Sequence, residues 1–517
     1  MKFLLFSIFS ALLFNICFAQ HTNVMISNEY LPEEPTIVIN PKNTNQLMAG
    51  ANLKSYYFSN DGGINWFNDT LISSYGVWGD PCVIVDTSGV FYFFHLSNPS
   101  FGNWIDRIVC QKMQSFGGNW NDGSFMGLNG TKAQDKEWAV VDRNTNKIYI
   151  TWTQFDDYDS HNPNDSTIIL FSKSTTQGNS WSTPKRINKI AGDCIDSDNT
   201  VEGAVPAVGP NGEIYVSWAG PEGLLFDKSL DEGNTWLEND IFVDSIPDGW
   251  DFDIPGISRC NGLPITACDL SQSPYRGTIY INWSDQRNDT TDTDIWLAKS
   301  TDGGLTWNSP ILVNDDNSGN HQFFTWMTID QTTGYLYFVF YDRRNYNDSR
   351  TDVYMAVSKD GGNSFINFKI SESSFVPNHK IFFGDYTNIT AHNNVVRPIW
   401  TRMHHNKLSI LTALIDVNAI GIDNRNYSPV SLEQNYPNPF NDNTYFSFKI
   451  RKTTNISLVV FDIFGREVAR LINNEIRVYG KYIENFDPDD YSLSPGVYYF
   501  SLLAENKNIV RKMIYVK

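Results

Sequence analysis

Basic residues are scarce in this 517-residue chain, which has 39 Lys and Arg against 58 Asp and Glu and a net charge of −19. Such an excess of negative charge opposes the phosphate backbone of nucleic acids, so nucleic-acid binding is not expected. Charged residues of both signs make up only 19% of the chain, whereas aromatic residues reach 14%. A chain this rich in aromatic side chains can bury a large core, which excludes intrinsic disorder.

Apolar runs long enough to span a membrane are also missing after the N-terminus. The run at residues 3–14, behind Lys2, is too short to cross a bilayer and is followed by small residues at Cys17 and Ala19. This pattern predicts a signal peptide over residues 1–19. We therefore expect the mature chain to leave the cytoplasm and to contain no transmembrane segment.

Cysteines are few, and no Cys-x-x-Cys pair or Cys/His cluster occurs, so a structural zinc site is not expected. Beyond the signal peptide the cysteines are odd in number. Cys260 and Cys268 bracket a short loop and are candidate disulfide partners, with Cys194 as a competing partner.

A short pattern, Ser-x-Asp-x-Gly-x-(Thr/Ser/Asn)-(Trp/Phe), recurs along the chain. Two degraded copies end at Trp120 and Trp181, the second with Thr176 in place of the aspartate. The terminal aromatics of successive copies are 54 to 71 residues apart. The complete copies have their aspartate and terminal aromatic at Asp61 and Trp66, Asp231 and Trp236, Asp302 and Trp307, and Asp360 and Phe365.

The residue types of this pattern suit a turn. The aspartate can accept backbone N–H bonds, the glycine supplies a positive φ, and the aromatic ring anchors the turn against a sheet. We therefore expect these residues to be structural and not catalytic.

An apolar strand, a turn and a second β-rich strand precede each copy, as in residues 81–96, 205–218 and 327–342. Four-stranded units of this kind need neighbours on both faces, which closure into a ring provides. The repeats resemble the Asp boxes, or BNR repeats, of the sialidase superfamily. The resemblance implies an all-β fold with a β-propeller over residues 20–416. Residues 386–416 add a further strand set that residues 23–27 would complete, so seven blades are favoured over the usual six.

The last segment, residues 432–517, follows a polar linker at 417–431 and loses the acidic excess of the preceding region. Its short alternating strands predict a small β-sandwich. The QNYPNPFN, FDIFGREV and terminal KMIYVK sequences closely resemble the type A C-terminal sorting domain of the type IX secretion system. The resemblance implies that residues 432–517 contact the type IX machinery. It also implies passage through the periplasm, followed by release or attachment at the outer-membrane surface.

Strand direction predicts where the chemistry lies. The boxes lie at one face of the ring, and the opposite face collects the residues that precede the innermost strands or follow the second strands. Its acidic members are Glu34, Asp80, Asp135, Glu137, Glu202 and Asp385, and Tyr386 adjoins the last of these. Its arginines are Arg287, Arg344 and Arg402.

The resemblance to sialidases implies roles for these residues in glycoside cleavage. Asp80 or Glu137 would be the acid/base, and Tyr386 the nucleophile. Arg287, Arg344 and Arg402 would bind an anionic group of the substrate, with Glu202 and Asp385 as further contacts. The structural alternative is that Arg287 pairs with Asp285 and Arg344 pairs with Asp342, each two residues earlier in the chain. No cofactor is expected, although the acidic ring would suit Ca²⁺.

The sequence departs from the sialidases in its first blade. Sialidases have an arginine there, but no arginine precedes Arg107 in this chain. Two functions therefore stay open. One is an exo-acting glycoside hydrolase on surface or environmental glycans. The other is a non-catalytic propeller that binds a glycan or a protein at the cell surface.

Overall fold

The computed structural model of the protein describes residues 21–417, 430–450, 453–478, 480–504 and 507–516. The chain divides into two compact units, Met1–Val417 and Asn418–Lys517. The expected signal peptide (1–19) and most of the expected linker (417–431) lie outside the described residues.

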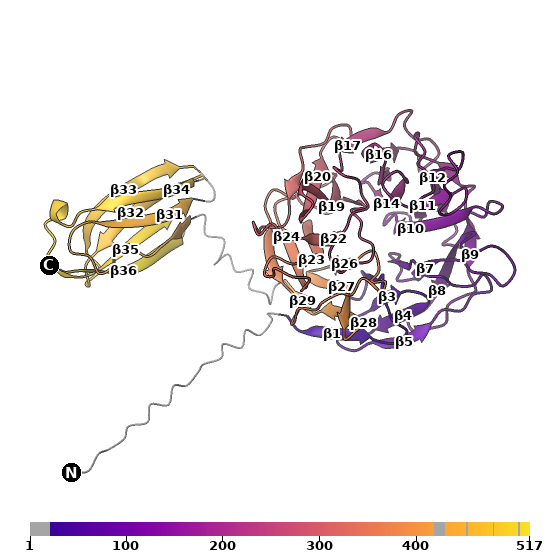
Figure 1. The fold of residues 1–517 in the computed structure, drawn as a ribbon, viewed down its shortest axis with the longest axis horizontal. Helices are drawn as coiled ribbons and strands as arrows, with labels where there is room; N and C mark the ends of the chain where they lie inside the picture. The colour runs from indigo at the N-terminus through magenta and orange to yellow at the C-terminus, as the bar shows by residue number, and fades with distance from the viewer. Residues whose placement is uncertain (1–20, 418–429, 451–452, 479, 505–506, 517) are drawn as a thin grey trace, which may run out of the picture. The chain divides into compact units, whose positions relative to one another are not determined.

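The described part of the first unit is a ring of seven antiparallel sheets, each with four strands in chain order, except the last sheet (Figure 1). The first four sheets consist of β2 (Thr36–Ile39), β3 (Leu47–Ala51), β4 (Ser55–Ser59) and β5 (Phe67–Thr70); β6 (Cys82–Val85), β7 (Phe91–Leu96), β8 (Ile108–Met113) and β9 (Ser124–Met126); β10 (Ala133–Val141), β11 (Ile148–Phe155), β12 (Thr167–Ser174) and β13 (Lys185–Arg186); and β14 (Glu202–Val208), β15 (Ile214–Gly220), β16 (Gly223–Ser229) and β17 (Ile241–Asp244).

The next two sheets consist of β18 (Ile265–Cys268), β19 (Ile279–Asp289), β20 (Asp292–Ser300) and β21 (Ile311–Leu312), and of β22 (Gln322–Asp330), β23 (Tyr335–Asp342), β24 (Asp352–Ser358) and β25 (Ile366–Lys369). The seventh sheet joins both ends of the unit, with β26 (Asn388–His392), β27 (Val395–His404), β28 (Lys407–Ala413), β29 (Ile415–Asp416) and the N-terminal β1 (Asn23–Ser27). β1 pairs antiparallel with β28, as expected for the strand that completes this sheet.

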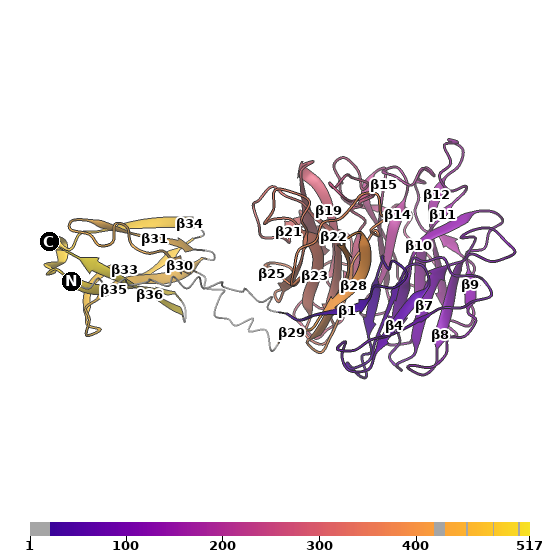
Figure 2. The same ribbon diagram turned by 60° about the horizontal axis from the view of Figure 1, so that its bottom comes forward.

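The innermost strands close the ring. β2, β6, β10, β14, β18, β22 and β26 each contact the next, and β26 contacts β2 again. Figure 2 shows the strands of the sheets running between the two faces of the ring. The residues at the start of β2, β6, β10 and β26 meet at one ammonium group, so these innermost strands begin at the same face. This arrangement is a β-propeller. The face at which the innermost strands begin is called the upper face below.

Large aromatic side chains fill the space between neighbouring sheets. The tryptophans within second strands, Trp152, Trp218, Trp283 and Trp400, are all fully buried. Burial of a side chain of this size contributes about 2–3 kcal/mol each in apolar transfer. The core of the unit is therefore shared between sheets, because no four-stranded sheet could cover these rings alone.

The repeated turns join third and fourth strands at the lower face. After β20, Asp302 Oδ1 accepts hydrogen bonds from the backbone amides of Leu305 and Thr306, both at 3.0 Å, and from the Ser300 hydroxyl at 2.7 Å. Hydrogen bonds from the Thr306 hydroxyl and amide hold the pKa of Asp302 below its usual range. The same bonding recurs at Asp61, Asp231 and Asp360.

The degraded copy that ends at Trp181 forms the same turn with a hydroxyl in place of the carboxylate. Here Thr176 Oγ1 accepts a hydrogen bond from the Ser180 amide at 2.9 Å. The terminal rings pack against the preceding sheet. Trp307 lies edge-on to Phe226 of β16, and Trp236 lies edge-on to Phe171 of β12, each with ring centroids 5.1 Å apart. The repeats thus tie each sheet to its neighbour, which is the structural role expected for them.

The disulfide considered for Cys260 and Cys268 does not form. Both are free and buried, as are Cys82, Cys110 and Cys194. Cys268 ends β18 inside the sheet, and Cys260 precedes that strand, so the loop that separates them in sequence does not bring the thiols together.

The second unit packs two sheets face to face. One has the order β30 (Val430–Leu432), β31 (Thr444–Ile450), β34 (Gly480–Phe486), and the other β33 (Glu467–Arg477), β32 (Thr454–Phe461), β35 (Gly496–Ala504), β36 (Lys507–Tyr515), with one 3₁₀ turn at Asp489–Tyr491. Alternate residues of β31 are buried, as period-two patterning requires. Phe446 stacks on Phe500 of the facing sheet with centroids 4.3 Å apart.

Candidate functional site

The innermost strands begin with an unusual backbone conformation at the upper face. Glu34, Asp80, Lys136 and Phe324 all have a positive φ between 48° and 52°, although none is glycine. At β10 and β22 this residue sits in a bulge that shifts the strand register. Non-glycine residues rarely adopt this conformation, and bulges redirect side chains. Here the conformation recurs at the start of four innermost strands.

The ammonium group of Lys136 lies where several sheets meet. Its Nζ is 2.9 Å from Asp385 Oδ2, 3.5 Å from Asp80 Oδ2 and 3.9 Å from Glu34 Oε1. The four residues precede or belong to innermost strands of four different sheets, so they can meet at one atom only near the ring axis. Lys136 is 7% exposed, and burial of all four groups strengthens the interactions.

A second cation, Arg259, lies beside the first. Its guanidinium donates hydrogen bonds to both carboxylate oxygens of Asp385 and, through Nη1, to Asp196 Oδ2 at 2.9 Å. Tyr158 donates to the same Asp196 oxygen at 2.6 Å. The six residues Glu34, Asp80, Asp135, Lys136, Arg259 and Asp385 are called the axial cluster below.

The carboxyl groups around the two cations differ in the direction of their pKa shifts. Burial by itself would raise the pKa of Asp385, but Lys136 and Arg259 outweigh it and hold that pKa well below its usual range. For Asp80, burial is again outweighed, here by the charge of Lys136 and by hydrogen bonds with Glu34 and Asp135, so its pKa is lowered.

The pKa values of neighbouring carboxyl groups are shifted upward. Burial, and then the negative charge of Asp80, raises the pKa of Glu34 and of Asp135 well above the usual value. Burial also raises the pKa of Glu202, with Asp196 as the next cause. The cluster therefore combines carboxyl groups whose pKa is lowered with carboxyl groups whose pKa is raised.

An open pocket of ≈ 210 Å³, the outer pocket, reaches the cluster from solvent. Glu33, Glu34, Asp80, Asp135 and Lys136 lie in its wall. Its rim is apolar and includes Leu53, Trp104 and Phe382, which are 47%, 44% and 41% exposed.

A smaller, more enclosed space of ≈ 30 Å³, the inner cavity, lies beyond Lys136. Its wall includes Asp385, Tyr386, Trp138 and Trp326. The ring of Tyr386 packs on that of Trp138 at 5.2 Å, and its hydroxyl is buried without a hydrogen-bond partner. Burial raises the pKa of Tyr386 well above its usual value, and the charge of Asp80 adds to this effect.

The expected acidic residues thus gather at the upper face, but not all reach a cavity. Asp80 lies in the wall of the outer pocket, and Asp385 and Tyr386 in that of the inner cavity. Glu137 is only 1% exposed, and both of its carboxyl oxygens lack a hydrogen-bond partner. Glu202 is equally buried and lines neither cavity.

The expected arginine clamp is not formed. Arg287 hydrogen-bonds Asp285 at 2.6 Å and Asp244 of β17 at 3.0 Å, and its guanidinium lies over the ring of Trp296. These partners belong to the second, third and fourth strands of sheets, away from the axis. The aspartate at the second position before the arginine is therefore a structural partner, as the alternative interpretation held.

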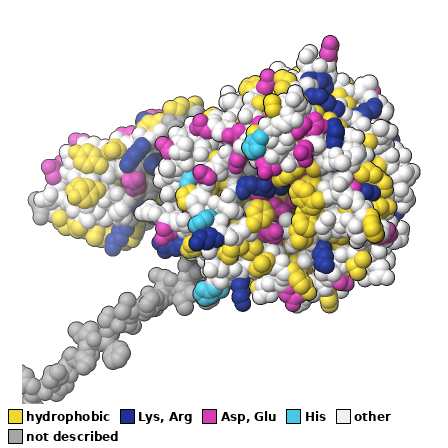
Figure 3. Space-filling model, turned by 45° about the vertical axis from the view of Figure 1, so that its right-hand side comes forward, with side chains coloured by type: hydrophobic (Ala, Val, Ile, Leu, Met, Phe, Trp, Pro, Cys, Tyr) yellow, Lys and Arg dark blue, Asp and Glu magenta, His cyan; other side chains and the backbone are white. Residues whose placement is uncertain are grey.

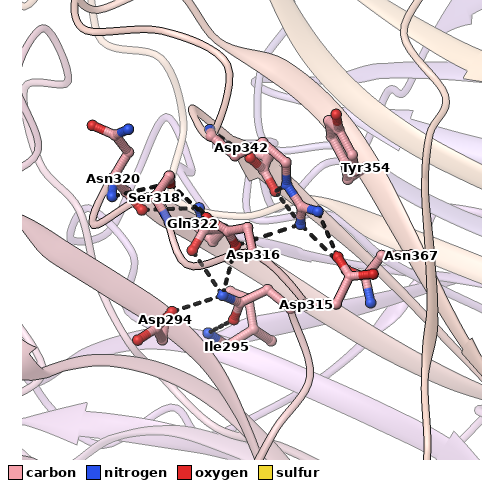
Figure 4. Close-up of polar contacts among 12 residues, drawn as sticks. Asp294, Ile295, Asp315, Asp316, Ser318, Asn320, Gln322, Asp342, Tyr354 and Asn367 are labelled. Atoms are coloured by element: carbon pink, nitrogen blue, oxygen red, sulfur yellow. Dashed lines mark hydrogen bonds and ion pairs between the residues drawn. The ribbon is translucent and has the colours of Figure 1, made fainter. Parts of the chain in front are cut away.

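The charge of Arg344 is also balanced by aspartates, at a different position in the propeller. It contacts Asp342 at 2.7 Å and Asp315 at 2.6 Å and lies over the ring of Tyr354. Figure 4 shows Asp342, Asp315, Tyr354 and neighbouring polar residues gathered at this position. The partners of Arg287 and Arg344 do not overlap, and neither set includes a member of the axial cluster.

Arg402, in β27, pairs in register with Ser409, and its Nε has no hydrogen-bond partner among the described residues. The cations that do reach the axis, Lys136 and Arg259, were missed from the sequence. The sequence contains one indication for Lys136, because this residue lies between Asp135 and Glu137 at the start of an innermost strand. Arg259 lies in a loop with no such pattern.

A metal site is not evident. Within the described residues, no group of three or more His, Cys, Asp or Glu side chains is arranged to hold a metal ion.

Residues 434–517 match a family model described as the secretion system C-terminal sorting domain. The C-terminal unit is a secretion sorting domain. The sorting domain marks the protein for the type IX route, so it is a cell-surface or extracellular protein. In the parts of the chain that the structure describes, no helix is both long and apolar enough to cross a bilayer.

Solved structures resemble the chain in fold. The NanB sialidase from Streptococcus pneumoniae has a TM-score of 0.43 at 10% identity, over 72% of this chain and 84% of that one. The Trypanosoma rangeli sialidase in complex with sialic acid has a TM-score of 0.44 at 12% identity, over 92% and 88%. An ulvan lyase has a TM-score of 0.45 at 13% identity, over 77% and 95%. No curated protein matches the chain in sequence.

Proposed function

We propose that the outer pocket is the active site of a glycoside hydrolase, which the exported propeller presents to surface or environmental glycans. The observation that carries this proposal is that Asp80 and Asp135 both lie in the wall of the outer pocket. Their pKa values are shifted in opposite directions, downward for Asp80 and upward for Asp135. Glycosidic bond cleavage uses a pair of carboxyl groups of which one is protonated and the other ionised.

The roles follow from the protonation states. Asp135, protonated, donates its proton to the oxygen of the leaving sugar. Asp80, kept ionised by Lys136, attacks the anomeric carbon or activates a water molecule. Lys136 is thus a positioning residue, since its contacts are with carboxylates of the cluster.

The rim of the outer pocket supports a sugar ligand. Trp104 and Phe382 expose aromatic surface at its edge, where they can cover the apolar face of a sugar ring. A pocket that ends at the axial cluster admits the end of a glycan chain, which favours exo-acting cleavage.

Tyr386 and Glu137 are poorer candidates for reacting groups than the sequence indicated. The Tyr386 hydroxyl is buried in the inner cavity, and Glu137 lines neither cavity. We expect Tyr386→Phe to keep most of the activity, whereas loss of turnover in that variant would restore the tyrosine nucleophile.

The test is hydrolysis of a panel of chromogenic glycosides, including sialosides, by the full-length protein. Asp80→Asn and Asp135→Asn should each lower kcat/KM at least about 100-fold, the usual contribution of a positioned acid or base. Asp289→Asn, the same change at an exposed hairpin residue, is the matched control. Turnover that survives both cluster variants would refute the proposal.

A second function, glycan or protein binding without turnover, is favoured by the extensive pairing inside the axial cluster. Lys136 and Arg259 are fully occupied by carboxylates, as they would be in a structural network. Saturable binding of an oligosaccharide or a surface protein, with no product formed from any glycoside of the panel, would favour this function.

A further inference from the structure

The cations of the site are not free to receive an anionic ligand. Lys136 and Arg259 are the only Lys or Arg side chains among the described residues that line the outer pocket or the inner cavity. Lys136 is held by three carboxyl groups, and Arg259 by Asp385 and Asp196. If either cation turned toward a ligand, a buried carboxylate would lose its partner, which is costly.

The wall of the outer pocket has an excess of carboxyl groups instead. Glu33, Glu34, Asp80 and Asp135 all line it. Glu33 is the member whose bonding is incomplete, because its Oε2 is buried and has no hydrogen-bond partner. Burial raises the pKa of Glu33 to about 8, and the negative charges of Asp80 and Asp385 contribute to this shift. A buried carboxyl oxygen without a partner is costly until a donor reaches it.

We infer that the outer pocket selects glycans whose terminal sugar bears a protonated amino group, with Glu33 as the residue that receives it; this inference rests on the hydrolase function proposed above. An ammonium group has three donors and a positive charge, so it can hydrogen-bond the open oxygen of Glu33 and favours release of the proton that the raised pKa keeps on this carboxyl group.

The apolar rim fits the same ligand. Phe382 already lies under one cation, with the guanidinium of Arg259 5.6 Å from its ring centre. Aromatic faces attract cations and also cover the apolar faces of sugar rings. On the face of the propeller shown in Figure 3, hydrophobic and acidic side chains lie next to one another. An amino sugar combines both features, whereas a simple metal cation would use only the carboxyl groups.

A sugar with a carboxylate or sulfate group is disfavoured for the converse reason. Its charge would lie beside Asp80, whose lowered pKa keeps it ionised, and no unpaired cation of the pocket would face it. Like charges placed together in this way lower affinity and help to exclude the wrong ligand.

The test measures binding and turnover separately, with the full-length protein and three oligosaccharides of equal length. These are a glucosamine oligomer, an N-acetylglucosamine oligomer and a glucuronic acid oligomer. Calorimetry at pH 6 should show the glucosamine oligomer binding at least about tenfold more tightly than the N-acetylated one, as expected for one charged contact. Binding of the glucuronic acid oligomer should be weaker still.

Two variants locate the effect. Glu33→Gln should reduce the preference for the glucosamine oligomer to within about threefold, because glutamine cannot release a proton and take on the negative charge that faces a bound ammonium group. Glu238→Gln, the same substitution at an exposed position of the propeller, should leave the preference unchanged. An unchanged preference in Glu33→Gln would overturn the role of Glu33.

The outcomes distinguish this inference from the hydrolase proposal. Tight binding of the glucosamine oligomer without cleavage would support the inference and refute the hydrolase. Cleavage of the N-acetylated or glucuronic acid oligomer with equal or greater efficiency would refute the inference and support the hydrolase. Equal binding of a lysine-rich peptide, or displacement of the sugar by Ca²⁺ alone, would overturn the assignment to amino sugars.

Discussion

Replacing Lys136 by methionine tests whether the axial cluster holds the propeller together. The ammonium group is enclosed by Asp385, Asp80 and Glu34 within 4 Å, and only 7% of the residue is exposed. Removing one partner of a buried ion pair typically costs about 3–5 kcal/mol. Arg259 still pairs with Asp385, so we expect the lower end of that range, about 3 kcal/mol, for Lys136→Met.

Lys147→Met provides the matched control. Lys147 pairs with Glu232 at 2.6 Å, but the two side chains are 26% and 43% exposed. Exposed pairs of this kind contribute about 0–1 kcal/mol, so the control should lose no more than that. Urea unfolding followed by tryptophan fluorescence measures both variants in the intact chain, because all 15 tryptophans lie between residues 66 and 400, in the propeller.

The cost of Lys136→Met should depend on pH. Lys136 lowers the pKa of both Asp80 and Asp385, so its stabilisation is present above their unfolded pKa, about 4. It is lost as the pH falls through the lower pKa values of the folded state. The difference between wild type and variant should therefore be largest near pH 7 and shrink below pH of about 4. Equal destabilisation of Lys136→Met and Lys147→Met, or a difference that grows in acid, would refute the reasoning.

Three further predictions concern other parts of the chain. Asp302→Ala should lower the free energy of unfolding of the propeller by about 1–2 kcal/mol through its lost turn hydrogen bonds, while leaving ligand affinity intact; a loss of binding in the folded protein would contradict a purely structural turn. Arg287→Ala and Arg344→Ala should leave oligosaccharide affinity within about twofold in calorimetry, because their partners lie away from the axis, and a tenfold loss would return them to the site. Deletion of residues 432–517 should leave a folded propeller in the periplasm of a host with the type IX system, and cell fractionation that finds the truncated protein outside the cell would disprove this.

The position of the carboxyl groups was predictable in part. Strand direction alone places the residues before innermost strands at one face, and Asp80, Asp135 and Asp385 do meet there. Their protonation was not predictable, because the pKa of each depends on burial and on the charges that other sheets bring within a few ångströms. Lys136 reaches Asp385 across 249 residues of sequence, and no local pattern encodes such a contact.

The arginines show the limit of reasoning from strand order. Arg344 follows a second strand, as expected, and Arg287 lies near the end of one. The end of the strand at which a residue lies does not determine how far its side chain is from the ring axis. Their side chains turn outward to aspartates near third and fourth strands, where geometry for a bidentate pair was available.

The sequence by itself determined the all-β class, the turns at the boxes and the C-terminal sorting domain, because each rests on short-range patterns of hydrogen bonding and alternation. Tertiary structure alone decided which charges share the axis, which cysteines stay apart and which arginines are already neutralised. Those outcomes depend on closure of the ring, which brings distant residues into contact and removes them from water, so that their energies depend on neighbours that the local sequence does not contain.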